Sequence, residues 1–83
     1  MYEVIISEPA KKFIRQLLIK QISKIINSIE TLSENPRPRG SKKLVGSNIY
    51  RIRVGDFRIL YAIDDKIKIV DIRKVGYRKN IYE

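Results

Sequence analysis

The fold of this chain is decided by residues 50–61, which read Tyr50-Arg51-Ile52-Arg53-Val54-Gly55-Asp56-Phe57-Arg58-Ile59-Leu60-Tyr61. Two runs rich in β-branched and aromatic residues flank a Gly-Asp pair, which is the pattern of two antiparallel strands joined by a two-residue turn. If Gly55 and Asp56 form the turn, Val54 faces Phe57, and each further pair lies one residue along on both strands. The stretch therefore predicts a β-hairpin with a defined register.

The predicted register separates the hairpin into two unlike faces. One face is wholly apolar or aromatic and comprises Tyr50, Ile52, Val54, Phe57, Ile59 and Tyr61. We expect it to pack on the core, because a slip by one residue would turn all of these side chains to the wrong side. The other face carries Arg53 across from Arg58, and Arg51 across from Leu60. Opposed like charges cost about 0.2–1 kcal/mol per pair, and guanidinium groups suit two-pronged contact with phosphate, so this face predicts an anion-binding site.

Upstream of the hairpin, the pattern changes from strand to helix. Residues 2–7 have strand composition and end at a Ser-Glu-Pro sequence that suits a helix start. Between residues 10 and 32, apolar side chains recur every three or four positions, as in amphipathic helices. This run would be long for one helix in so small a domain, so we expect a helical hairpin that breaks near residues 19–21.

Downstream of the helices, residues 35–43 contain two prolines and four basic side chains, and we expect a stiff, exposed connector. We expect Leu44 and Val45 to anchor the end of this connector in the core. Three runs have strand composition, namely 49–54, 57–63 and 67–75. The sequence therefore predicts an α+β fold: a strand, a helical hairpin and a three-stranded antiparallel meander, with the helices on one face of the sheet.

The composition excludes several functional classes. The chain has 83 residues, 43% of them hydrophobic and 33% charged, and no apolar run approaches the roughly 18 residues of a membrane span. Cys and His are both absent, which excludes thiol catalysis, histidine catalysis and the common zinc sites. The N-terminus lacks the basic and apolar segments of a signal peptide, so we expect one cytoplasmic domain.

Positive charge is concentrated in the second half of the chain. The net charge is +9, and residues 36–83 carry thirteen basic side chains against five acidic ones. The C-terminal stretch contains Tyr77, Arg78, Lys79 and Tyr82, a basic and aromatic mixture typical of segments that stack bases and hold phosphates. We therefore expect an anionic partner, such as a nucleic acid, to meet this half of the chain.

Several segments resemble the RelE/ParE superfamily of small bacterial and archaeal toxins. They are the hairpin at residues 50–61, ENPRP at 34–38, KKLVGS at 42–47 and VGYRKNIY at 75–82. The resemblance extends over nearly the whole chain and implies one RelE-like toxin domain over residues 1–83. The superfamily fold has a strand, a helical hairpin and three more antiparallel strands, which agrees with the order read from the residues.

The resemblance also implies an activity and its residues. RelE-type members enter the ribosome and cleave messenger RNA, by attack of a 2′-hydroxyl on the adjacent phosphate. The catalytic positions implied here are Arg51, Arg53, Arg58, Arg78 and Tyr82. RNA contacts are expected from Arg37, Arg39, Lys42, Lys43, Tyr77 and Lys79. Clustered guanidinium groups can hold the phosphate and its extra charge, so we expect a metal-independent endoribonuclease, an mRNA interferase that inhibits translation without a cofactor.

These residues leave open which side chain is the general base that accepts the proton of the 2′-hydroxyl. Many relatives have His where Tyr77 stands, and arginine is a poor proton acceptor because it remains protonated at neutral pH. Tyr77 or Tyr82 could accept the proton if neighbouring arginines lower its pKa.

The resemblance implies a protein partner, and two other functions stay open. The partner is a RelB-like antitoxin whose acidic or amphipathic segment wraps the toxin, covering the arginines and apolar outer-face residues such as Ile49 and Leu60. One alternative is a ParE-like toxin that inhibits DNA gyrase by binding. The other is a catalytically silent relative or a basic binding module.

Overall fold

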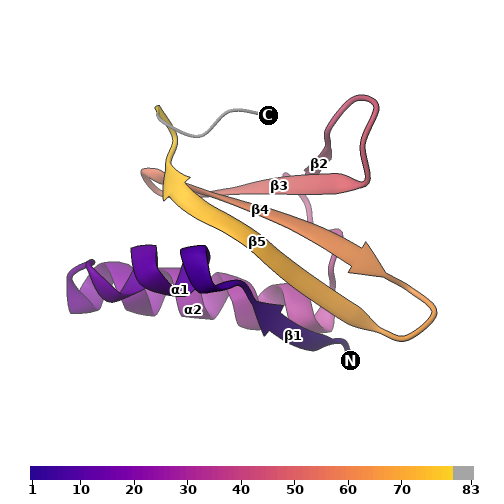
Figure 1. Cartoon of the computed structure of the whole chain (residues 1–83), viewed down its shortest axis with the longest axis horizontal. Helices are drawn as coiled ribbons and strands as arrows, with labels where there is room; N and C mark the ends of the chain where they lie inside the picture. Colours follow the sequence, from indigo (N-terminus) through magenta and orange to yellow (C-terminus); the bar gives the residue numbers. More distant parts are fainter. Residues whose placement is uncertain (80–83) are drawn as a thin grey trace.

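The computed structural model describes residues 1–79 of the chain. Its elements follow in the order β1 (Glu3–Ile6), α1 (Glu8–Arg15), α2 (Ile19–Glu34), β2 (Lys42–Lys43), β3 (Ile49–Val54), β4 (Phe57–Asp64) and β5 (Ile69–Tyr77). Both helices lie on the same side of the sheet, below it in Figure 1. The predicted α+β class, with helices on one face, is confirmed. Neither helix of the described part is long and apolar enough to cross a membrane.

The described strands form one mixed sheet in the order β1-β5-β4-β3-β2. The pairs β3–β4 and β4–β5 are antiparallel, which confirms the predicted meander. The meander is extended at both edges, by β1 running parallel to β5 and by the short β2 beside β3. The prediction that residues 42 and 43 belong to the connector is wrong. They form β2 because the chain turns back beyond them, where the Leu44 N–H donates to the Ile49 carbonyl (2.8 Å).

Local hydrogen bonds define where the helices begin. The Ser7 hydroxyl accepts a hydrogen bond from the backbone of α1 (3.2 Å), so it is the cap that precedes the first turn. The helical hairpin breaks at residues 16–18, slightly earlier than predicted. Leu18 is extended, and its N–H donates to the side-chain carbonyl of Gln21 (3.0 Å), which fixes the start of α2. Apolar periodicity continues through this break, so periodicity alone does not locate it.

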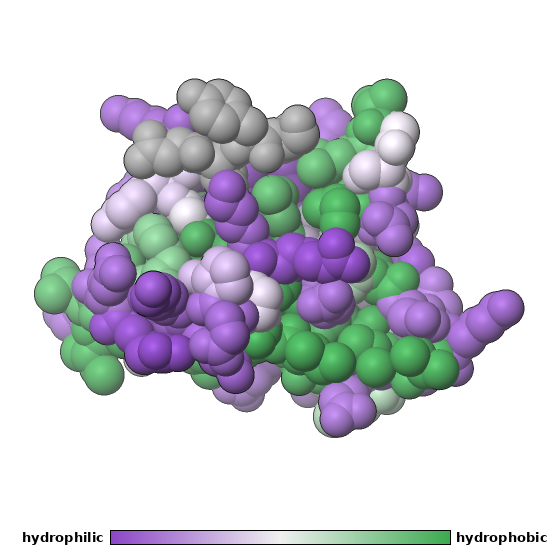
Figure 2. Space-filling view, in the orientation of Figure 1, coloured by the Kyte–Doolittle hydropathy of each residue, from purple (hydrophilic) through white to green (hydrophobic). Residues whose placement is uncertain are grey.

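The core lies between the helices and the sheet. Its fully buried side chains include Ile25 and Leu32 of α2 and Ile59 and Ile72 of the sheet, each stabilising the fold by roughly 1.5–3 kcal/mol through burial. The register of β3 and β4 is the predicted one, and the predicted apolar face packs into the core. Further hydrophobic residues appear in green at the lower right of Figure 2, where β1 lies in Figure 1. Because the apolar face of the hairpin packs into the core, its arginine face is turned away from the helices.

The connector between α2 and β2 is held by other residues than predicted. Val45 is fully exposed, because the turn between β2 and β3 extends away from the helices (Figure 1), so it does not anchor the chain. Pro36 is buried instead, and its carbonyl accepts a hydrogen bond from the Tyr61 hydroxyl (2.7 Å). Arg37 forms a two-pronged ion pair with Asp65 (2.8 and 3.1 Å). These contacts fasten the connector to β4 and to the turn that follows it.

Candidate nucleic-acid interface

The centre of the candidate site is an arginine pair on the face of the sheet opposite the helices. Arg53 of β3 and Arg58 of β4 are register partners, as predicted. They form the second residue pair from the tight turn at Gly55 and Asp56, so the strand pairing fixes their backbones. Arg53 is exposed, whereas Arg58 is half-buried and its Nε is shielded from solvent. The site is therefore built around one partly desolvated guanidinium group.

Three further positive charges act on Arg58. Burial lowers the pKa of Arg58 below its ordinary value, and the charges of Arg51, Arg53 and Arg78 lower it further. Like charges lower the pKa of a guanidinium only when they lie within electrostatic reach of it. Arg51 and Arg58 also make other interactions within the chain. The fold thus brings together the four arginines that the sequence analysis selected.

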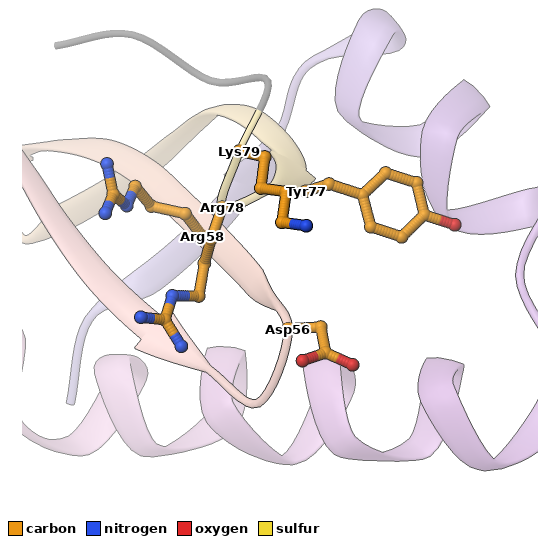
Figure 3. Close-up of a pocket in the computed structure, with 5 residues that line it drawn as sticks. All are labelled: Asp56, Arg58, Tyr77, Arg78 and Lys79. Carbon is orange, nitrogen blue, oxygen red and sulfur yellow. The ribbon is translucent and has the colours of Figure 1, made fainter.

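Arg78 reaches this cluster because the pairing of β4 with β5 continues beyond Tyr77. The Arg78 N–H donates to the Asp56 carbonyl (2.9 Å), so the chain stays beside the hairpin turn. Gly76 of β5 is the register partner of Arg58, so β5 passes directly beside the arginine pair. Figure 3 shows the guanidinium groups of Arg58 and Arg78 pointing to the same side of the ribbon.

An open pocket of about 690 Å³ lies at this end of the sheet. It is lined by Asp56, Arg58, Tyr77, Arg78 and Lys79. In Figure 3 the Asp56 carboxylate points away from the two guanidinium groups, so it does not neutralise them. Pockets of this size hold ligands as large as a nucleotide, and three cationic side chains in the lining favour an anionic one.

Tyr77 lines this pocket, but its ring lies on the helix side of the sheet. Its register partner is the buried Phe57. The Tyr77 ring centroid lies 5.2 Å from that of Phe57 and 5.4 Å from that of Phe13 in α1. In Figure 3 the ring extends away from the guanidinium groups. Aromatic packing therefore separates the Tyr77 hydroxyl from the arginine cluster.

The basic residues of the connector region are divided between several places. Arg39 and Lys42 line a pocket of about 360 Å³ together with Arg51 and Arg53, so these two adjoin the cluster. Lys43 instead lines a hollow formed with the turn between β2 and β3. Of these side chains, only those of Arg39 and Lys42 can extend the arginine surface.

Arg37 is engaged at the opposite end of the hairpin. Its guanidinium pairs with Asp65, donates from Nε to the Tyr50 hydroxyl (3.2 Å) and lies over the Tyr50 ring, 5.3 Å from its centroid. The hydrogen bonds to Asp65 and Tyr50 raise the pKa of Arg37. These contacts hold Arg37 away from the arginine cluster, at the other end of the hairpin, and its predicted RNA contact stays a prediction.

One basic residue of this face, Lys74 of β5, was missed by the sequence analysis. Lys74 is exposed and is the register partner of Leu60. Simple alternation along β5 would place Lys74 with the buried Val70 and Ile72, on the helix side. A bulge in the β4–β5 pairing adds an extra residue, Arg73, and reverses that alternation. The sequence carries a sign of the bulge, because the apolar alternation of Val70 and Ile72 resumes at Val75 after two consecutive charged residues.

The apolar residues of this face are less accessible than expected. Leu60 lies on the predicted face but is only 8% exposed. Arg51 and Lys74 flank Leu60 in the same row of the sheet, and long basic side chains cover apolar surface with their aliphatic stems. Leu60 is therefore not the open docking residue that the sequence analysis expects, whereas Ile49 is half-buried.

The chemistry of the described site is charge stabilisation. Clustered guanidinium groups can bind phosphate oxygens and neutralise the charge that develops on them. Within residues 1–79, no group of three or more acidic residues gathers to hold a metal ion. Tyr82, the fifth predicted catalytic residue, lies outside the described residues. Arginine remains protonated near neutral pH, so the clustered arginines supply positive charge and not a proton acceptor.

Comparison with known proteins finds relatives along nearly the whole chain. The family model for "ParE toxin of type II toxin-antitoxin system, parDE" matches residues 4–82. A protein of Methanocaldococcus jannaschii named "Putative toxin RelE1" is 34% identical over 86 residues, which cover 99% of this chain and 96% of that protein.

Two solved structures have a similar fold. One is the archaeal RelE-RelB complex from Pyrococcus horikoshii, with a TM-score of 0.82 and 26% identity over 96% of this chain and 98% of that one. The other is the toxin-antitoxin complex RelBE2 from Mycobacterium tuberculosis, with a TM-score of 0.81 and 28% identity over 93% of this chain and 98% of that one.

Proposed function

Because this chain belongs to the ParE toxin family of type II toxin-antitoxin systems and is a RelE-type toxin, we propose that it cleaves messenger RNA. It acts without a metal ion, on messenger held in the ribosome, and so inhibits translation. The observation that carries this proposal is the convergence of Arg51, Arg53 and Arg78 on the half-buried Arg58. Gathering like charges is unfavourable, and a bound phosphodiester offsets that repulsion.

In the proposed reaction, a 2′-oxygen forms a bond to the adjacent phosphorus, and the bond from that phosphorus to the 5′-oxygen of the next nucleotide breaks. The products are a 2′,3′-cyclic phosphate and a 5′-hydroxyl. We assign Arg58 and Arg78 to the non-bridging phosphate oxygens, because their guanidinium groups point to the same side. These oxygens carry the extra negative charge in the transition state, which the two cations stabilise.

The reaction also needs a proton acceptor for the 2′-hydroxyl and a donor for the leaving 5′-oxygen. We favour Tyr82 over Tyr77 as the acceptor, because the Tyr77 ring packs on Phe13 and Phe57 on the helix side. A positioned acid or base contributes about 10²–10⁴-fold to a rate. Alignment of the messenger by the ribosome supplies a further part of the acceleration.

We also propose that a RelB-like antitoxin binds this chain. The P. horikoshii and M. tuberculosis structures are both toxin-antitoxin complexes. The net charge of +9 favours an antitoxin segment with acidic residues, which electrostatic attraction would bring to the arginine surface quickly. An antitoxin that covers the arginines would exclude RNA from them.

The test is translation of a defined messenger by purified ribosomes, with the wild-type chain and an Arg58→Ala, Arg78→Ala double variant. We expect cuts in phase with the codons, made at least about 10²-fold more slowly by the variant, because losing one charge-stabilising donor costs about 10²–10³-fold. Lys66→Ala is the matched control, since Lys66 is an exposed cation in the turn between β4 and β5. Phased cuts that persist at the wild-type rate in the double variant would contradict the proposal.

Inhibition of DNA gyrase by binding is the second candidate, because the matching family model is that of ParE toxins. Binding to gyrase has no need of a phosphate-cleaving cluster. A supercoiling assay separates the two functions. Inhibition of supercoiling, without RNA cuts and equally strong in the double variant, would favour the gyrase target.

A further inference from the structure

The row of side chains beside the arginine pair carries additional positive charge. Lys42, Arg51, Leu60 and Lys74 are successive register partners across β2, β3, β4 and β5. Neighbouring residues on one face of a strand are about 7 Å apart, so this row lies one such step from Arg58. That step is comparable with the length of one nucleotide in an extended backbone.

Lys74 contributes an exposed cation to this row. The nearby carboxylate of Asp71 is already engaged by the Arg73 Nε (2.9 Å). In the part of the chain that the structure describes, no salt bridge joins Lys74 to a carboxylate. The ammonium group of a lysine, on its flexible stem, can follow a phosphate without demanding a fixed geometry. Lys74 is thus suited to hold an anion next to the arginine cluster.

We propose that Lys74 is a substrate-binding residue that holds the RNA phosphate adjacent to the scissile one. This inference rests on the proposed function, since the scissile phosphate is the one assigned to Arg58 and Arg78. The backbone of the messenger then runs from the cluster across Leu60, one nucleotide for each row of the sheet. The bulge at Arg73 makes this possible, because it turns Lys74 to the arginine side.

The test uses ribosomes programmed with a messenger whose scissile nucleotide is 2′-deoxy, so that the toxin binds without cutting. The linkages on either side of the scissile phosphate are made neutral in turn, as methylphosphonates. One neutral linkage should weaken binding of the wild-type toxin about 3- to 10-fold and leave binding of Lys74→Ala unchanged. Lys74→Ala should also lower the slope of log affinity against log salt by about 0.7–1, and Lys74→Arg should restore the wild-type slope.

Lys66→Ala removes the same charge from an exposed site in the turn between β4 and β5 and should show none of these effects. The inference is overturned if Lys74→Ala binds like the wild type, or if the neutral linkages weaken both proteins equally. It is also overturned if Lys74→Ala weakens binding of the antitoxin alone. Cleavage of unmodified messenger is read separately. If the wild-type toxin cuts, but the effect of the neutral linkages does not depend on the Lys74 side chain, only this inference is refuted. If the wild-type toxin does not cut, the proposed function is refuted.

Discussion

Tyr61 joins the core to the connector through a single hydroxyl group. Its side chain is fully buried, and its hydroxyl donates to the Pro36 carbonyl (2.7 Å). Burial raises the pKa of Tyr61 to about 12. The unfolded chain therefore releases this proton near pH 10, before the folded chain does, and folding stability declines between about pH 10 and 12.

Tyr61→Phe should remove both effects of the hydroxyl. At neutral pH the free energy of unfolding should fall by about 1 kcal/mol, because the Pro36 carbonyl loses its donor. Above pH 10 the variant should lose stability less steeply than the wild type. Urea denaturation followed by circular dichroism measures both quantities, with Tyr77→Phe as the control for losing a hydroxyl at neutral pH. Parallel stability curves above pH 10 would contradict the assignment.

The hairpin of β3 and β4 is the element that holds the arginine pair. Gly55, the first turn residue, has a φ of 59°, which is left-handed, whereas the second turn residue, Asp56, does not have a positive φ. A positive φ at the first position alone is the pattern of a turn that suits the twist of paired strands. Glycine is favoured there because an L side chain is strained at this backbone angle, although the space around Gly55 is open.

Gly55→Ala should therefore cost about 1–2 kcal/mol of unfolding free energy, measured by urea denaturation. The register should survive, because the apolar face of the hairpin still specifies it. The variant should consequently cleave far better than the Arg58→Ala, Arg78→Ala double variant. Asp56→Ala is the control from the same turn and should lose less stability. An equal loss in both variants would show that the backbone angle is not the cause.

Across the molecule, Asp65 links the turn between β4 and β5 to the connector and to the N-terminal segment. It accepts hydrogen bonds from Arg37 of the connector and from the Tyr2 hydroxyl (2.7 Å) at the N-terminus. The hydrogen bonds from Arg37 and Tyr2 lower the pKa of Asp65 to about 2. A lowered pKa in the folded state gives stability that is present above about pH 4 and is lost as the pH falls toward 2.

Asp65→Asn should reduce the free energy of unfolding at pH 6 and flatten its decline between pH 4 and 2. At pH 2 the wild type and the variant should approach the same stability, because the carboxyl of the wild type is then largely protonated. Chemical denaturation at a series of pH values checks this. Glu30→Gln removes a carboxylate from the exposed side of α2 and is the control. A stability gap that stays constant down to pH 2 would refute the role of this ion pair.

The hairpin, its register and the faces of its strands follow directly from the amino-acid pattern. These features follow from a two-residue turn and strict alternation, which are local and need no knowledge of the remaining chain. For that reason the local pattern alone predicts Arg53 opposite Arg58 and Tyr61 in the core, and the structure confirms both. The helical layer was predictable for the same reason, because its apolar period is carried by neighbouring residues.

The full set of side chains beside the arginine cluster depends instead on long-range packing. The bulge in β5, the ring packing of Tyr77 and the ion pair of Arg37 all depend on residues far away in the sequence. Each changes the face or the partner of a charged or aromatic side chain. Lys74 therefore lies on the arginine face of the sheet, whereas the Arg37 side chain pairs with Asp65 away from it. Periodicity describes one segment at a time, whereas register shifts and ion pairs between distant segments are settled by packing of the whole chain.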